Sequence, residues 1–218
     1  MNIFDELLEA VKPIWDQYYI HPFVLGIQNG TLEKDRFKYY LIQDELYLKD
    51  YTRCFALGLA KAKSDKTTKL FSDYIQALTT EVDLHSGYYQ KLAITKEDLE
   101  TTKMNLDNLS YTSFMLRISY EYEEVEILAA ILACAYSYEL IAKKMIENKS
   151  DCMDDPFYGD WIKGYASKEY ADHNVELISM FNELTKSITD TQKENLKEIF
   201  ECCSYYELRF WENSYQKA

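Results

Sequence analysis

The sequence predicts an all-α protein in which a single helical bundle spans residues 1–218. Apolar residues recur at three- and four-residue spacings almost throughout, which is the periodicity of amphipathic helices. Only six glycines and three prolines occur in 218 residues, and this scarcity argues against the many turns of a β fold. A hydrophobic content of 47% with 28% charged residues is typical of a globular protein with a substantial core. No linker, repeat or low-complexity tract divides the chain, so we expect one domain.

Local signals support several of the helix boundaries. Pro13 should bend or split the first helix, because proline removes a helical hydrogen bond. Pro22 suits the first turn of the second helix. The run Asn29-Gly30-Thr31 ends that helix and offers Thr31 as the N-cap of the next, and Thr189 with Gln192 has capping-box spacing. The expected helices cover residues 3–18, 22–28, 33–61, 66–91, 96–103, 111–121, 124–147, 155–164, 168–186 and 191–216.

Charge and cysteine usage limit the classes of function. The net charge of −13 and the pI near 4.7 disfavour contact with nucleic acid or with an anionic membrane surface. The longest apolar stretch, residues 127–136, is too short to span a bilayer, and the acidic N-terminus lacks the pattern of a signal peptide. No CxxC pair occurs among the cysteines, so we expect a cytoplasmic protein with reduced thiols. The cysteines are Cys54, Cys134, Cys152, Cys202 and Cys203.

Two segments place chemically useful side chains on helical faces. Cys134 lies in the middle of an apolar helix, with Tyr138 one turn later, where a phenol could stabilise the reactive thiolate. Asp44, Tyr47 and Tyr51 follow an i, i+3, i+7 pattern, so they share one face. A buried carboxylate there must be paired or must contact a ligand.

The last helix adds a third segment, in which Glu207 is followed by the large rings of Phe210 and Trp211. A thiol, two carboxylates and several phenols from distant helices could together add a nucleophile to a flat, polar heterocycle. On residue type alone the structural interpretation is the more usual one, because buried cysteines usually act as small hydrophobes and long bundles need aromatic rings to fill volume. Whether Cys203 reaches the same site is left undecided.

Two alternatives belong to other classes of protein. Glu81 with His85 and Glu169 with His173 are i, i+4 pairs, and with Glu139 they could ligate metal in a di-iron oxygenase. The usual di-iron motif is Glu-x-x-His, however, whereas both pairs here read Glu-x-x-x-His, which is more typical of structural hydrogen-bonded pairs. The second alternative is a non-catalytic module that binds a pyrimidine or a protein partner.

Several short runs, in order along essentially the whole chain, resemble the TenA/thiaminase II family. Each run is weakly specific alone, and their ordered sum carries the resemblance. They are His21-Pro22-Phe23, Ile27-Gln28-Asn29-Gly30-Thr31-Leu32, Gln43-Asp44-Glu45-Leu46-Tyr47, Glu81-Val82-Asp83-Leu84-His85, Tyr111-Thr112-Ser113, Cys134 with Tyr138-Glu139, Tyr158-Gly159-Asp160-Trp161, Tyr165, and Tyr206-Glu207 with Phe210-Trp211.

The resemblance implies a haem-oxygenase-like helical bundle, commonly a homotetramer, that uses no metal or organic cofactor. It implies hydrolysis of 4-amino-5-aminomethyl-2-methylpyrimidine to the hydroxymethyl compound with release of ammonia, as thiamin salvage. Cleavage of thiamin into the same pyrimidine and its thiazole is the associated activity.

The resemblance also implies roles for individual residues. Cys134 would be the nucleophile, which places the chain in the cysteine-bearing branch of the family. Asp44 would pair with the pyrimidine amino group and the adjacent ring nitrogen, and Glu207 would protonate the opposite ring nitrogen. The remaining substrate-binding residues would be Tyr47, Tyr111, Tyr138 and Tyr165.

Overall fold

The structure is a computed structural model that describes residues 2–216, apart from the side chains of residues 79–86. Every regular element within this range is helical, which confirms the predicted all-α class. The elements in chain order are α1 (Ile3–Ile20), α2 (Pro22–Asn29), α3 (Lys34–Lys61), α4 (Asp65–Lys91), α5 (Lys96–Thr101), α6 (Leu106–Glu121), α7 (Glu124–Asn148), the 3₁₀ helix η1 (Ser150–Asp154), α8 (Gly159–Tyr165), α9 (Lys168–Leu184) and α10 (Asp190–Gln216).

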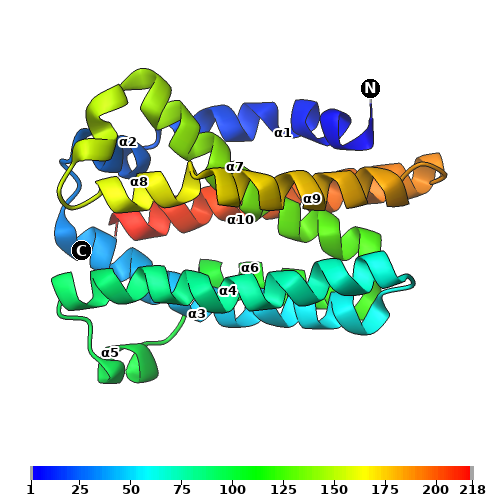
Figure 1. The fold of residues 1–218 in the computed structure, drawn as a ribbon, viewed down its shortest axis with the longest axis horizontal. Coiled ribbons are helices and arrows are strands. Elements are labelled where there is room, and N and C mark those ends of the chain that lie inside the picture. Colours follow the sequence, from blue (N-terminus) through cyan, green and yellow to red (C-terminus); the bar gives the residue numbers. More distant parts are fainter. Residues whose placement is uncertain (1, 217–218) are drawn as a thin grey trace.

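Most of the long helices run roughly along the long axis of the molecule, and α7 crosses it obliquely (Figure 1). Helix α3 packs against α4 and α6, while α10 packs against α1 and α7. Helix α7 contacts α3, α6, α9 and α10, so it occupies the centre of the bundle. Side chains that point inward from α3, α7 and α10 can therefore meet, as sites in helical bundles require.

Helix α7 is apolar on nearly all sides because neighbouring helices surround it. It extends well beyond residues 127–136, and by length and composition alone it could cross a membrane. The prediction that this apolar segment is too short was therefore wrong. However, 83% of its most apolar window is buried inside the protein, which accounts for the composition.

Helix α1 continues through Pro13, so the proline does not split the helix. Pro13 lies on the exposed face, where water can satisfy the carbonyl that loses its partner. The buried face is anchored to α10, because Trp15 Nε1 donates to Ser204 Oγ at 2.9 Å and the Tyr18 hydroxyl donates to the Ser204 carbonyl.

The turn between α2 and α3 differs in detail from the prediction. Pro22 occupies the first turn of α2 as expected. Gly30 ends the helix with a φ of 70°, a conformation that glycine adopts without strain. The N-cap of α3 is Glu33 rather than Thr31, and its side chain makes no capping hydrogen bond.

The first residues of two other helices differ from the predicted ones because of contacts that the sequence does not reveal. Helix α6 begins at Leu106 rather than at residue 111, since Asn105 caps it and the buried Asn108 Nδ2 donates to the Gln43 carbonyl at 2.8 Å. The helix expected at 155–164 begins only at Gly159, as α8; residues 155–158 form a turn after η1, because the Asp155 carboxylate accepts from the backbone N–H groups of residues 157 and 158. By contrast, the predicted capping box between Thr189 and Gln192 is present.

Candidate functional site

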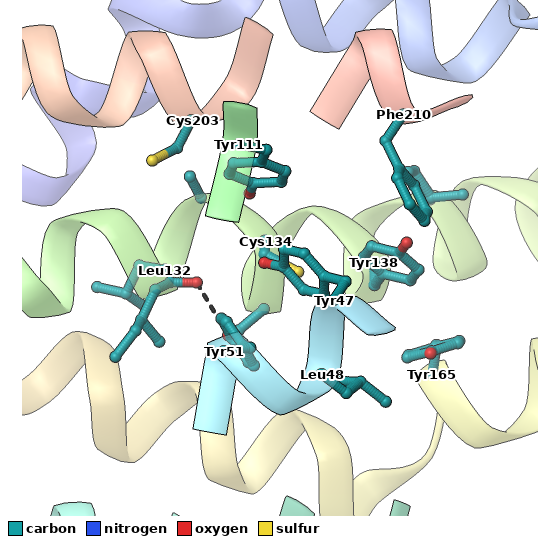
Figure 2. Close-up of a cluster of buried hydrophobic side chains, with 14 of the residues drawn as sticks. Tyr47, Leu48, Tyr51, Tyr111, Leu132, Cys134, Tyr138, Tyr165, Cys203 and Phe210 are labelled. Carbon is teal, nitrogen blue, oxygen red and sulfur yellow. Dashed lines mark hydrogen bonds between the residues drawn. The ribbon is translucent and has the colours of Figure 1, made fainter. Parts of the chain in front are cut away.

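A small inner cavity lies between α3, α7, α8 and α9, with a volume of about 20 Å³. Four helices thus contribute side chains to one cavity inside the bundle. Figure 2 shows Tyr47 facing Cys134, with Tyr138 and Tyr165 beside them. The lining residues are Asp44, Tyr47, Leu48, Tyr51, Cys134, Tyr138, Tyr165 and Tyr170.

The α3 side of the inner cavity is formed by the predicted face of Asp44, Tyr47 and Tyr51, all of which are buried. The rings of Tyr47 and Tyr51 are stacked, with centroids 5.3 Å apart. The Tyr51 hydroxyl donates to the Ile131 carbonyl of α7 at 3.1 Å, and the Tyr47 hydroxyl contacts Met115 Sδ at 3.5 Å. These bonds fix the ring pair against α7 and α6.

Cys134 and Tyr138 form the α7 side of the inner cavity. Cys134 is only 8% exposed, and its thiol lies behind the Tyr47 ring in Figure 2. The Tyr138 hydroxyl is directed toward α10, where its hydrogen bond lowers the pKa of Glu207. The predicted contact of this phenol with the Cys134 sulfur stays a prediction.

Glu207 lies behind the aromatic lining of the inner cavity rather than on its surface, since it is not among the lining residues. Burial raises the pKa of its carboxyl to about 7, an effect that the hydroxyls of Tyr138 and Tyr111 oppose. The carboxyl is 2% exposed, and its Oε1 has no hydrogen-bond partner among the described residues. A carboxyl with a pKa near 7 can both donate and accept a proton at neutral pH.

Tyr111 joins this second layer from α6. Its ring is stacked on Tyr206 at 5.6 Å and lies 5.1 Å from Tyr47. Burial raises the pKa values of Tyr47, Tyr111 and Tyr138 well above the ordinary value, so these phenols remain protonated donors. Trp211 Nε1 is buried without a partner among the described residues, as Glu207 Oε1 is. Buried polar atoms of this kind are characteristic of ligand sites.

Of the sequence-predicted site residues, Asp44, Tyr47, Cys134, Tyr138 and Tyr165 line the inner cavity, and Tyr111 and Glu207 stand directly behind it. Cys203, which the sequence left undecided, does not line the cavity. Burial raises its thiol pKa well above the ordinary value, so it behaves as a core residue.

Tyr170 was missed by the sequence analysis. Its ring meets Tyr165 edge-on at 5.2 Å, and its hydroxyl donates to the Ala135 carbonyl at 3.0 Å. Nothing in the sequence distinguishes it from the other tyrosines, of which there are 20 in the chain. Only the packing of α9 against α7 brings it to the site.

A larger outer cavity of about 240 Å³ adjoins the inner one. Tyr51, Tyr165 and Tyr170 line both cavities and separate them. The remaining described residues of the outer cavity come from α4, α7, α8 and α9. They are Tyr74, Ala77, Leu78, Ala135, Gly164, Ser167, Glu169, His173 and Asn174.

The residues of the di-iron alternative do not form a metal site among the described side chains. Glu139 is buried and engaged, since it pairs with Lys143 and accepts from Asn174 Nδ2 at 2.6 Å. Glu81 and His85 lie outside the described side chains. Elsewhere in the described part of the chain, no group of three metal-ligating side chains is found.

Comparison with known proteins identifies the family. Residues 8–217 match the model of the TENA/THI-4/PQQC family. An aminopyrimidine aminohydrolase of Halalkalibacterium halodurans is 39% identical over 218 residues, covering 100% of this chain and 97% of that protein. The structure of a TenA homologue from P. horikoshii superposes with a TM-score of 0.84 at 31% identity, with each chain fully covered.

The haem-oxygenase-like fold is likewise confirmed. Haem oxygenase-1 from the cyanobacterium Synechocystis shares the fold with a TM-score of 0.65, at 15% identity over 98% of this chain and 92% of that one. The resemblance seen in the sequence therefore extends to the model of the family and to the three-dimensional structure. The chain belongs to the TENA/THI-4/PQQC family.

Proposed function

We propose that this protein is an aminopyrimidine aminohydrolase of thiamin salvage. It converts 4-amino-5-aminomethyl-2-methylpyrimidine and water to the hydroxymethyl compound and ammonia, and it cleaves thiamin to the same pyrimidine and its thiazole. Full-length relatives with the name aminopyrimidine aminohydrolase support the reaction class. The observation that carries the proposal within this chain is Glu207, a buried carboxyl with a pKa near 7 and an unpartnered oxygen beside the cavity that holds Cys134.

Cys134 begins the proposed reaction by covalent catalysis. Its sulfur bonds to the ring carbon next to the one that carries the methylene group, while Glu207 gives its proton to the adjacent ring nitrogen. This addition removes the aromaticity of the ring. The electron pair of the 4-amino group can then form a C=N bond, and the ring double bond shifts to the exocyclic methylene. The bond from the methylene to the leaving nitrogen breaks, and its electron pair departs with that nitrogen. The aminomethyl group reacts in its ammonium form and so leaves as ammonia, whereas the thiazolium of thiamin leaves as the neutral thiazole.

Water completes the reaction. Its oxygen bonds to the exocyclic methylene, its proton passes to solvent, and the electrons return to the ring and the 4-amino group. The Cys134 thiolate then leaves as Glu207 takes back the proton from the ring nitrogen, and aromaticity is restored. One carboxyl therefore acts in both directions, which suits a pKa near the working pH.

Asp44 has a distinct role in this scheme. The 4-amino group becomes positively charged when the leaving group departs, and a buried carboxylate stabilises a cation more strongly than an exposed one does. The protonated hydroxyls of Tyr47, Tyr111 and Tyr138 can donate to ring nitrogens, and the aromatic faces can stack on the pyrimidine.

The inner cavity must widen when substrate binds, because about 20 Å³ accommodates little more than one water molecule. The lining consists mainly of aromatic side chains, which can rotate about their side-chain bonds while the surrounding helices stay in place. We propose that Tyr165 and Tyr170, which separate the two cavities, make this movement.

An ammonia-release assay on the aminomethylpyrimidine tests the function. Cys134→Ser should lower the rate by at least about 10³-fold with the fold retained, since an alcohol without a base is a far poorer nucleophile. Cys202→Ser is the matched control. Because Cys202 is exposed on α10, its replacement should leave the rate of ammonia release unchanged. A serine variant that keeps most of the activity would exclude Cys134 as the nucleophile, and a wild-type protein that binds pyrimidine without releasing ammonia would indicate a binding module.

We further propose that the protein is a cytoplasmic homotetramer that binds neither nucleic acid nor membrane. The net charge of −13 supports the exclusion of anionic partners. Leu106 on α6, which is 80% exposed, together with Leu109 and with Tyr205 on α10, gives this side of the molecule apolar surface that subunit contact would bury. Light scattering at micromolar concentration tests the oligomer, and a monomer would contradict it.

A further inference from the structure

A chain of hydrogen bonds leads from Trp161 to Glu207 through two buried tyrosines. Trp161 Nε1 donates to the Tyr40 hydroxyl at 3.3 Å. The Tyr40 hydroxyl is hydrogen-bonded in turn to the Tyr138 hydroxyl, which is hydrogen-bonded to the Glu207 carboxyl. Each of these four side chains belongs to a residue that is at most 4% exposed, so water does not compete for the bonds. This hydrogen-bond chain connects α8, α3, α7 and α10.

Aromatic packing holds the rings of the hydrogen-bond chain in place. The Tyr40 ring is stacked on Trp211, with centroids 5.6 Å apart and an interplanar angle of 19°. The Tyr138 ring lies 5.1 Å from Trp211 and 6.0 Å from Trp161. Because Trp211 follows Glu207 by one turn of α10, the indole that packs on both phenols and the carboxyl lie on the same helical face. Figure 2 shows the Tyr138 hydroxyl directed toward α10. The hydroxyl oxygens therefore have fixed positions, and only their hydrogens can turn.

The chemistry of its first member gives the hydrogen-bond chain a direction. An indole N–H can only donate, whereas a hydroxyl donates one hydrogen bond and also accepts. The Tyr40 oxygen therefore accepts from Trp161, and its hydrogen can be donated to the Tyr138 oxygen. The Tyr138 hydrogen is then donated to Glu207. The opposite direction would leave the Tyr40 hydrogen without an acceptor, since Trp161 and Tyr138 are its hydrogen-bond partners among the described residues.

This direction determines which oxygen of Glu207 holds the proton. Oε1 has no hydrogen-bond partner among the described residues, so the bond from Tyr138 falls on Oε2. In a neutral carboxyl one oxygen carries the hydrogen and the other is the better acceptor. The hydrogen of neutral Glu207 therefore lies on Oε1, the oxygen that can exchange it with a ligand. If Tyr138 accepted instead, the hydrogen would lie on Oε2, between the carboxyl and the phenol.

We propose that Tyr40 is a positioning residue for proton transfer. With Trp161 it keeps the Tyr138 hydroxyl donating to Oε2 of Glu207, so that the proton for the substrate stays on Oε1. No proton moves along the hydrogen-bond chain, which only sets where the proton is held. This assignment rests on the proposed function, and it adds to the reaction a residue that does not line the inner cavity.

The charge of Glu207 depends on these hydrogen bonds because its other ionisable neighbours are neutral. The buried ionisable groups that face Glu207 are Tyr18 of α1, Tyr40 and Tyr47 of α3, Tyr111 of α6, Tyr138 of α7 and Cys203 of α10. Burial raises the pKa of each group well above its ordinary value, so all of them are uncharged at neutral pH. Burial also raises the pKa of Glu207, and the bonds from Tyr138 and Tyr111 oppose this rise by stabilising the anion. Weakening the Tyr138 bond should therefore raise the pKa of Glu207 further.

Infrared titration of the ligand-free protein tests this arrangement without relying on activity. The carbonyl stretch of the protonated carboxyl is followed with pH, and Glu207→Gln identifies the band. Tyr138→Phe removes a hydrogen bond to a charged group, so it should raise the pKa of Glu207 by about 1 to 2 pH units. Tyr40→Phe should raise this pKa by roughly half a pH unit, because successive hydrogen bonds strengthen one another. The double variant should match Tyr138→Phe, since Tyr40 acts through Tyr138.

Tyr158→Phe is the matched control. Tyr158 is a buried phenol that packs on the same Phe37 ring as Tyr40, and its hydroxyl donates to the Leu32 carbonyl at 2.6 Å. Its replacement also removes one buried hydrogen bond, but it should leave the pKa of Glu207 unchanged. Circular dichroism of each variant establishes that the helical fold is retained.

Ammonia release gives a second reading. Tyr40→Phe should lower kcat about three- to tenfold with KM unchanged, because Tyr40 acts on the proton and does not touch the substrate. The basic limb of kcat/KM, which reports loss of the Glu207 proton, should move to higher pH. Tyr158→Phe should change neither the rate nor the pH profile.

The proposal is overturned if Tyr40→Phe leaves the pKa of Glu207 at its wild-type value, if the double variant shifts this pKa by the sum of the single shifts, or if KM rises while kcat is retained. A wild-type protein that releases no ammonia would refute the proposed hydrolase function. The infrared titration would still decide whether Tyr40 directs the carboxyl of Glu207.

Discussion

Replacing Glu207 with glutamine should stabilise the folded protein at pH 8 while it slows the reaction. The folded state holds this carboxyl at a pKa of about 7, against an ordinary value of 4.5, because burial penalises the charged form. Between these two pH values the folded state binds more protons than the unfolded state. Stability contributed by this group is therefore present at about pH 4.5 and below, and it is lost as the pH rises through 7.

The magnitude follows from the shift. Each pKa unit corresponds to about 1.4 kcal/mol, so ionisation of Glu207 costs about 3 kcal/mol of unfolding free energy at pH 8. Glutamine does not ionise and avoids this cost. Urea unfolding of both proteins from pH 5 to pH 8 should show the free-energy advantage of Glu207→Gln growing by about 2.5 kcal/mol over that range, because a smaller part of the cost is already present at pH 5.

Glu201→Gln supplies the control, since Glu201 is exposed on the same helix and its replacement should give a profile parallel to wild type. If the Glu207→Gln profile also runs parallel to wild type, the carboxyl titrates at its ordinary pKa. The argument that it transfers protons near neutral pH would then fail. A normal turnover number in the glutamine variant would place the acid elsewhere.

Three further outcomes are expected. Asp44→Asn should bind the product pyrimidine about ten- to a hundredfold more weakly in calorimetry, because an amide cannot replace a charge-assisted bond, and unchanged affinity would exclude that contact. Limited alkylation with peptide mapping should show that product pyrimidine protects Cys134. The exposed Cys202 should be labelled equally with and without the pyrimidine. Labelling of Cys134 that the pyrimidine does not reduce would show that Cys134 lies outside the ligand site. Gly58→Ala should lower the unfolding free energy by about 1 kcal/mol in urea titrations despite better helix propensity, because its Cβ would lie 2.4 Å from the buried Phe71 ring; a stabilised variant would show that the ring can move.

Periodicity within one helix was the most informative property of the sequence. It predicted the shared face of Asp44 and Tyr47, and the i, i+4 relation of Cys134 and Tyr138. It also gave most helix boundaries, because apolar spacing and caps are local. The start of α6 escaped this reasoning, since its first polar residues are held in a helix by Asn108, which donates to the Gln43 carbonyl of α3.

Relations between helices could not be predicted in the same way. The hydrogen bond of the Tyr138 hydroxyl with Glu207 depends on how α7 and α10 are rotated against each other. The same holds for Tyr170, which reaches the site only through the packing of α9. Distance along the chain carries no information about such rotations, and the raised pKa of Glu207 arises from burial that only the folded bundle provides.

Hydrogen bonds to two backbone carbonyls connect the turn of α7 that carries Cys134 to the neighbouring helices α3 and α9. The carbonyl of Ile131 accepts from Tyr51 of α3, and the carbonyl of Ala135 accepts from Tyr170 and Asn174 of α9. These two carbonyls lie on either side of Cys134 along the helix. The direction in which the thiol points is therefore fixed by hydrogen bonds from α3 and from α9. Any ligand that turns the Tyr170 ring must also break or bend a bond to this segment. A ligand that displaces Tyr170 from the outer cavity can therefore shift the position of the Cys134 sulfur at the inner cavity, without any movement of α7 as a whole.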